Sequence, residues 1–177
     1  MILLIDLCYE KDSLSQYEFV LPIKRIVESL KQKAEIIHVT ELTDEHIEKA
    51  NKIIICGTAL KDNVFLDHHA KFEWLKTTKK PVLGICAGMQ IIGLAFGANV
   101  IQQKEIGMTQ IITKDEIFGD TMISGYELHG NNTTLPEGFT IIAENVKGTQ
   151  AIKKNNIYGI VFHPEVRNKK LIENFLK

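Results

Sequence analysis

Residues 81–97 read Pro-Val-Leu-Gly-Ile-Cys-Ala-Gly-Met-Gln-Ile-Ile-Gly-Leu-Ala-Phe-Gly, and this stretch decides the fold. The apolar run 81–85 predicts a short buried strand. The apolar residues of 89–96 predict a helix that Gly97 ends. The chain therefore passes directly from a strand into a helix, and Cys86 stands at the junction.

Cys86 is flanked by Gly84 two residues before it and by Gly88 two residues after it. This is the form of a nucleophile elbow, in which the reactive side chain sits on a sharp strand-to-helix turn. Glycines are needed there because helix and strand cross closely and larger side chains would collide. The helix N-terminus would favour a thiolate. The alternative is a buried structural cysteine in an ordinary turn.

Composition limits the class of protein. With 177 residues and 45% hydrophobic content, we expect one domain over residues 1–177. The net charge of -1 and the lack of long charge runs predict no nucleic-acid or membrane partner. The N-terminus lacks the pattern of a signal peptide, and no apolar stretch would span a bilayer. Three cysteines without metal-type spacing favour a reducing compartment, so we expect a cytoplasmic protein.

Strands and helices alternate along the first half of the chain. Apolar runs at 2–7, 34–39, 52–56 and 81–85 predict strands, and helical spacing is found at 18–33, from 43 onward and at 65–77. This order predicts an open α/β fold of the flavodoxin type, a mostly parallel sheet flanked by helices. Later β-like stretches at 111–112, 121–128, 139–143 and 151–152 predict additional, partly antiparallel strands, before a last strand at 157–162 and a helix at 168–177.

Ligands in such sheets bind at the carboxyl ends of the strands. Cys8, Gly57 and Cys86 each fall at or just beyond a predicted strand end. We therefore expect all three to lie along one edge of the molecule.

A cysteine nucleophile needs a histidine to exchange its proton, and that histidine needs an orienting acid. Of the six histidines, His38 and His46 fall inside a strand and a short helix, where a structural or solvated role is expected. His68 and His69 stand beside Asp67, but adjacent histidines point apart and no third ligand is near, so we predict no metal site. His129 and His163 remain, each at the end of a β-like segment.

His163 is the stronger candidate. It follows an apolar strand, Pro164 fixes its backbone, and Glu165 lies two residues on. Residues i and i+2 of an extended segment face the same side, so the Glu165 carboxylate can reach the His163 ring. The alternative is a surface turn with a solvated histidine and glutamate.

The sequence Gly84-Ile85-Cys86-Ala87-Gly88-Met89-Gln90, followed later by His163-Pro164-Glu165, resembles the class I (triad-type) glutamine amidotransferases. That family carries Gly-x-Cys-x-Gly-x-Gln at its elbow and His-Pro-Glu as its distal motif. The resemblance covers nearly the whole chain. Among family members, His129-Gly130 and the run Leu135-Pro136-Glu137-Gly138-Phe139 look most like the glutaminase part of GMP synthases.

The resemblance implies a role for each matched residue. Cys86 would be the nucleophile, His163 the general base and acid, and Glu165 its orienting partner. The backbone N–H groups of Ala87 and Gly57 would form the oxyanion hole. The remaining matched residues would bind the substrate glutamine, namely Gln90, His129, Gly130 and Asn131.

The sequence departs from the family at one loop. Relatives usually carry Gly-Gly-Pro or a Pro-Gly type sequence, whereas this chain reads Cys56-Gly57-Thr58-Ala59-Leu60. Losing one oxyanion donor lowers a rate on the order of 10²–10³-fold. We therefore expect that the hole is formed differently, or that it is completed only when a partner docks, and that the isolated chain has low activity.

The resemblance implies hydrolysis of glutamine through a γ-glutamyl thioester, without a metal or organic cofactor. It also implies a separate synthetase subunit, which receives the ammonia and docks over the strand-end edge, including the loop 8–16. Two other functions stay open: a non-catalytic binding or regulatory protein, and a γ-glutamyl hydrolase that uses the same three residues.

Overall fold

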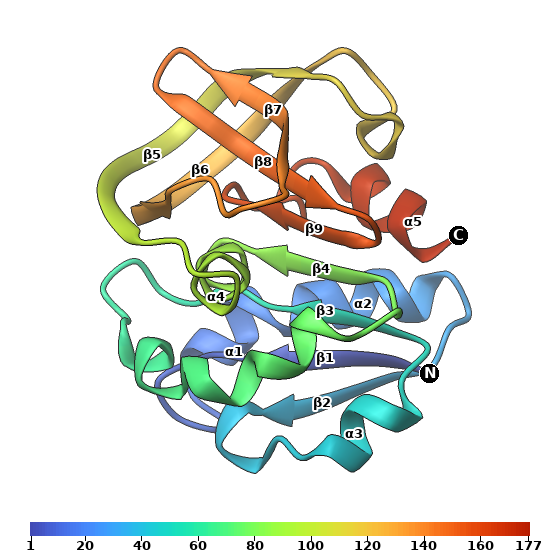
Figure 1. Cartoon of the computed structure of the whole chain (residues 1–177). Coiled ribbons are helices and arrows are strands. Elements are labelled where there is room, and N and C mark those ends of the chain that lie inside the picture. The colour runs from blue at the N-terminus through green and yellow to red at the C-terminus, as the bar shows by residue number, and fades with distance from the viewer.

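The computed structural model describes all residues, 1–177, and its centre is one nine-stranded sheet (Figure 1). The strands are β1 (Ile2–Asp6), β2 (Ala34–His38), β3 (Lys52–Ile55), β4 (Val82–Ile85), β5 (Val100–Thr113), β6 (Met122–Thr133), β7 (Thr140–Asn145), β8 (Gly148–Lys154) and β9 (Ile157–Ile160). Their order in the sheet is β2-β1-β3-β4-β9-β8-β7-β5-β6. The first five strands in this order pair in parallel, and the others continue the sheet with antiparallel pairs. The predicted fold class is confirmed.

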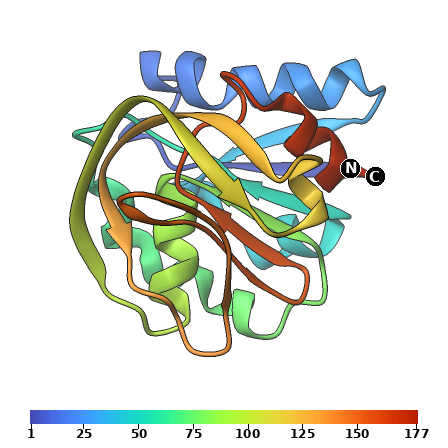
Figure 2. The ribbon, with the colours of Figure 1, turned by 90° about the horizontal axis from the view of Figure 1, so that it is seen from above.

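Helices cover both faces of the parallel half (Figure 2). The α-helices are α1 (Leu14–Phe19), α2 (Leu21–Ser29), α3 (Asp44–Lys49), α4 (Ala87–Ala95) and α5 (Lys169–Leu176). Three further segments are 3₁₀-helical, namely Val39–Glu41, Val64–Lys76 and Glu116–Phe118. In Figure 2, α1, α2 and α5 lie on one face, and α4 with the long 3₁₀ segment lies on the other.

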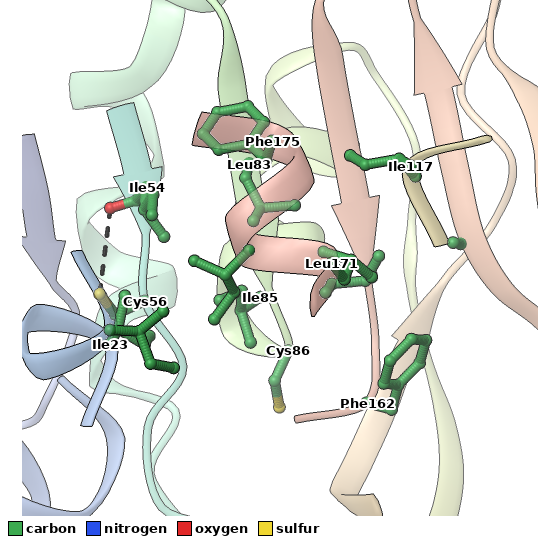
Figure 3. Close-up of a cluster of buried hydrophobic side chains, with 14 of the residues drawn as sticks. Ile23, Ile54, Cys56, Leu83, Ile85, Cys86, Ile117, Phe162, Leu171 and Phe175 are labelled. Atoms are coloured by element: carbon green, nitrogen blue, oxygen red, sulfur yellow. Dashed lines mark hydrogen bonds between the residues drawn. The ribbon is translucent and has the colours of Figure 1, made fainter. Parts of the chain in front are cut away.

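The sheet separates two hydrophobic cores. Because side chains alternate across a strand, Leu4 of β1 packs into the core under α2 and α5, while Leu3 and Ile5 pack into the core under α4. Burial on both faces explains why the central strands are continuous apolar runs in the sequence. Figure 3 shows the first core, with Cys86 at its lower end, below Ile85 and at the same end as Phe162.

Several element boundaries differ from the sequence-based expectation. The helix predicted over 18–33 begins already at Leu14 and is divided at Val20, because Pro22 starts a new helix in its first turn. The segment predicted as a helix over 65–77 is 3₁₀-helical. The β5–β6 hairpin is much longer than the short stretches predicted at 111–112 and 121–128, since polar residues in the first half of β5 hide its alternation.

No helix of the chain combines the length and the apolar character that a bilayer crossing requires.

We predict that the crossing of α4 over β3 tolerates no side chain at Gly88. A Cβ atom there would lie 2.2 Å from the Ile55 carbonyl oxygen, a backbone atom that has no room to move. We expect Gly88→Ala to lower the free energy of unfolding by about 2 kcal/mol or more, measured by urea denaturation.

Gly97→Ala is the matched control. Gly97 has φ +81° and nothing within 4 Å of its added Cβ, so only its backbone preference is lost, at about 1 kcal/mol. Equal losses in the two variants would contradict the close crossing.

Candidate active site

Cys86 occupies the turn between β4 and α4 in a strained conformation. Its φ of 51° and ψ of -104° are rare for a residue with a side chain. A Cβ on Gly84 would meet the Gly88 backbone at 2.6 Å, and one on Gly88 would meet Ile55. Such conformations cost about 1–3 kcal/mol and persist only where the surrounding packing enforces them. The strain supports the elbow predicted from the sequence.

His163 and Glu165 form a buried pair at the end of β9. His163 Nδ1 lies 2.7 Å from Glu165 Oε1, and the two side chains are 1% and 2% exposed. The ring of Phe19 packs against the imidazole, with 5.4 Å between the ring centroids. The other ring nitrogen, Nε2, has no hydrogen-bond partner of good geometry. The pair thus holds the ring in one orientation and leaves one nitrogen available.

The Gly57 backbone lies between this imidazole and Cys86. A Cβ built on Gly57 would be 3.0 Å from His163 Cε1 and 3.4 Å from Cys86 Cβ. Three segments that are distant in sequence, the ends of β3, β4 and β9, therefore meet at one point. Ala87 is the first residue of α4, so its N–H group has no acceptor within the helix.

Charge in this site favours a protonated imidazole. Burial is the largest single influence and lowers the pKa of His163, but the negative charges of Glu165 and Cys86 together outweigh it and raise the pKa well above 6.5. Because the folded-state pKa exceeds the unfolded value, the stabilisation is fully present below about pH 6.5. It is lost as the pH rises through the folded-state pKa. An imidazolium beside the Cys86 sulfur fits a cysteine nucleophile.

The residues predicted to bind substrate line one cavity with Cys86. Gln90, Gly130 and Asn131 border it, and Gln90 Nε2 donates to the Asn131 carbonyl over 3.3 Å. Gln90 Oε1 is buried without a partner. The His129 side chain is fully buried and contacts Glu127. The structure therefore brings the four residues predicted to bind substrate together beside Cys86.

The loop 57–63 closes this cavity to a volume of about 10 Å³, room for about one water molecule. Thr58 Oγ1 donates to Asp62 Oδ2, and Asn131 Nδ2 donates to Asn63 Oδ1 over 3.1 Å. The Leu60 carbonyl lies 3.7 Å from the position of a Cβ on Gly130. A glutamine side chain is far larger than one water, so the cavity in this form does not hold one.

Two features of the site were missed from the sequence. The contact of Asn63 with Asn131 joins segments whose proximity no local pattern reveals. Asp6, fully buried at the end of β1, accepts from Cys8 N and from Gln16 Nε2, and so holds the loop 8–16 in place. A charged residue closing an apolar run was the signal that could have revealed it.

A model of one family, described as glutamine amidotransferase class-I, matches residues 12–177. The chain therefore belongs to the class I glutamine amidotransferases.

Its relatives include one subunit of the glutamine-hydrolysing GMP synthase of Methanosarcina acetivorans, which is 31% identical over 170 residues, with 88% of each chain covered. The glutamine-hydrolysing GMP synthase of Brachyspira hyodysenteriae is 41% identical over 111 residues, which are 54% of this chain and 21% of that protein. The chain thus matches only about a fifth of the length of the longer relatives.

Solved structures share the fold. A candidate GMP synthase subunit from Thermoplasma acidophilum has a TM-score of 0.85 at 24% identity, with 99% of this chain and 91% of that chain covered. A glutamine amidotransferase of Thermotoga maritima has a TM-score of 0.73 at 22% identity, with 99% and 81% covered. The nine-stranded architecture is therefore that of known amidotransferase structures.

We predict that Glu165→Gln lowers the pKa of His163, because it removes a negative charge from the ring. The pKa is measured by NMR titration of the His163 ring. Alkylation of Cys86 by iodoacetamide at neutral pH should slow in the same variant. Burial raises the pKa values of the Cys8 and Cys56 thiols, so the alkylation reports on Cys86.

Glu48→Gln, at an exposed position on α3, is the control and should change neither quantity. An unaltered His163 titration in Glu165→Gln would show that the carboxylate does not govern the ring.

Proposed function

We propose that residues 1–177 act as one glutaminase domain that hydrolyses the side-chain amide of glutamine and supplies ammonia to a separate synthetase. The observation that carries this proposal is the strained Cys86 beside the buried His163–Glu165 pair, in a chain of the class I amidotransferase family. The relatives named GMP synthase support GMP formation as the reaction that consumes the ammonia.

The chemistry follows from the three side chains. The Cys86 thiolate attacks the amide carbon, and the oxyanion accepts hydrogen bonds from the N–H groups of Ala87 and Gly57. Protonated His163 gives its proton to the departing nitrogen, which leaves as ammonia and a γ-glutamyl thioester remains. His163 then takes a proton from water, the hydroxide attacks the thioester, and glutamate and the thiolate are released. These steps require no cofactor.

Binding of glutamine would use the cavity next to Cys86. Gln90 Oε1, buried and unpartnered, is suited to accept a hydrogen bond from the substrate amide. The backbone of Gly130 and Asn131 would hold the amino-acid end. Since the loop 57–63 fills this space, we propose that catalysis requires its displacement and that the synthetase promotes it, which agrees with the low activity expected of the isolated chain.

An uncharged surface on the β5–β6 hairpin supports a partner subunit. Ile106, Met108 and Ile112 project from one face of β5, beside Met122 on β6, and each is more than half exposed. We name these four residues the hairpin face. The face continues into the cavity, because Leu128, opposite Ile106, lines it. Exposed apolar patches on an edge hairpin mark interaction sites.

We propose that the synthetase covers the hairpin face together with the loop 8–16, so that ammonia passes between the subunits without reaching water. The relative from Methanosarcina acetivorans, named as one subunit of its enzyme, supports an association of separate chains. We also place the protein in the cytoplasm, where its three free cysteines remain reduced.

We predict that a diazoketone analogue of glutamine labels Cys86 and abolishes glutamine hydrolysis. Cys86→Ala should lose the labelling and nearly all glutaminase activity, measured as glutamate formed, with the synthetase present and absent. Cys8→Ala removes a buried thiol outside the proposed chemistry and serves as the control.

Labelling that survives Cys86→Ala would refute the nucleophile. Labelling without any turnover, even with the synthetase, would instead favour a binding protein. Turnover of γ-glutamyl peptides but not of glutamine would favour the hydrolase.

We predict that the double variant Ile112→Lys/Met122→Lys weakens binding of the ammonia-dependent GMP synthetase subunit of the same organism by tenfold or more, about 1.4 kcal/mol. Calorimetry gives the affinity, and GMP formation from glutamine should fall while formation from added ammonia is unchanged. Val146→Lys, at a fully exposed position in the β7–β8 turn, is the control. Equal affinities of the double variant and the control would remove the hairpin face from the interface.

A further inference from the structure

A second histidine–glutamate pair lies behind the cavity wall, and the mechanism above gives it no part. His129 and Glu127 project from the same face of β6, with His129 Nε2 3.2 Å from Glu127 Oε2 and both side chains at most 1% exposed. Glu105, opposite His129 on β5, brings a second carboxylate to 3.9 Å from the same nitrogen. The interior of the hairpin thus holds two acidic side chains and one imidazole.

The two carboxylates differ in what compensates their charge. Glu105 accepts hydrogen bonds from amide groups on β5, β7 and β8, supplied by Gln103, Asn145 and Gln150, and Lys147 Nζ lies 3.9 Å away. Neither oxygen of Glu127 has a hydrogen-bond partner of good geometry, and His129 Nε2, 3.2 Å from Glu127 Oε2, has none either. An uncompensated buried carboxylate is strongly unfavourable. His129 is the basic group in contact with Glu127, so it must supply the compensation.

The other nitrogen of the His129 ring, Nδ1, also faces an oxygen atom. Nδ1 lies 3.1 Å from the Asn131 carbonyl oxygen, which can only accept, so Nδ1 carries a proton. A carboxylate also only accepts, so the 3.2 Å contact of Nε2 with Glu127 would be favourable only with a proton on this nitrogen too. A ring that carries both protons has one more than a neutral imidazole beside a carboxylate.

Two hydrogen bonds to one carbonyl connect the buried pair to the cavity. The Asn131 carbonyl accepts from His129 Nδ1 on one side and from Gln90 Nε2 on the other, at 3.1 and 3.3 Å. Asn131 and Gly130 border the cavity beside Cys86. This stretch of β6 thus contacts a ring whose opposite nitrogen lies 3.2 Å from Glu127.

We propose that Glu127 is a positioning residue, which holds His129 as an imidazolium so that the ring fixes the Asn131 carbonyl and, with it, the backbone that receives the amino-acid end of the substrate. The assignment rests on the proposed function only for the identity of that substrate. The charged pair itself is a property of the resting protein.

The first experiment measures the protonation of His129 without substrate. Two-bond ¹H–¹⁵N NMR spectra of the full chain at neutral pH should show both ring nitrogens protonated in the wild type. In Glu127→Gln only Nδ1 should remain protonated, because the amide does not stabilise the charge. The His129→Gln spectrum assigns the signals by their disappearance. Glu144→Gln, at a half-exposed glutamate of β7 that pairs with Lys114, is the matched control.

The second experiment measures what the pair does for the site. Glutamine affinity, determined by calorimetry in a Cys86→Ala background, should fall on the order of tenfold in Glu127→Gln, and KM for glutamine should rise equally while kcat changes little. Glu144→Gln should change neither. If Glu127→Gln does not fold, Glu127→Met removes the same charge and fills the space with an apolar side chain.

A wild-type His129 with a single protonated nitrogen would overturn the charged pair. Unchanged affinity and KM in a variant whose His129 spectrum has changed would overturn the positioning role. If the wild type neither binds nor hydrolyses glutamine, both the proposed function and the positioning role are wrong. The NMR result on the charged pair does not depend on that outcome.

Discussion

The close crossing of α4 over the ends of β3 and β4 is the constraint on which the rest of the structure depends. Gly84 and Gly88 allow backbones to approach within distances that no side chain permits, and the turn between them forces Cys86 to a positive φ. The strain of about 1–3 kcal/mol is held in place because β4 and α4 are buried in cores on both faces of the sheet. Packing far from the sulfur therefore fixes where the sulfur lies.

Two histidine–glutamate pairs join residues two positions apart, but on different backbones. Glu127 and His129 share a face of the strand β6, whereas His163 and Glu165 meet in a turn after β9 and not in the extended segment expected from the sequence. In His163–Glu165 the carboxylate contacts Nδ1, and Nε2 is left without a partner near Cys86. In Glu127–His129 the carboxylate contacts Nε2, while Nδ1 is bound to a backbone carbonyl. The first arrangement leaves a nitrogen for proton transfer. In the second, both nitrogens face oxygens inside the protein, which suits a ring that positions its neighbours.

The sequence allowed the fold class and the Cys86–His163–Glu165 constellation to be predicted because each depends on local patterns, namely apolar runs, flanking glycines and a two-residue spacing. The roles given to Gln90 and Gly130 remain predictions. Glu105 and Glu127 were not singled out, because a glutamate in a β-like stretch is expected at the surface, and its burial depends on amides from strands far along the chain. The contact of Asn63 with Asn131 likewise depends on tertiary proximity.

The closed cavity and the hairpin face are best understood together. Opening the loop 57–63 gives up the side-chain hydrogen bond from Asn131 to Asn63, worth about 1 kcal/mol, so the closed form is favoured only modestly. A partner can shift this equilibrium only by as much as it binds the open form better than the closed one. The loop 57–63 is not part of the hairpin face. A partner that contacts only this face would therefore bind without opening the loop. Under the proposed function, the synthetase must therefore also contact the loop or the neighbouring residues 8–16, and the subunits would share one interface for binding and for opening the site.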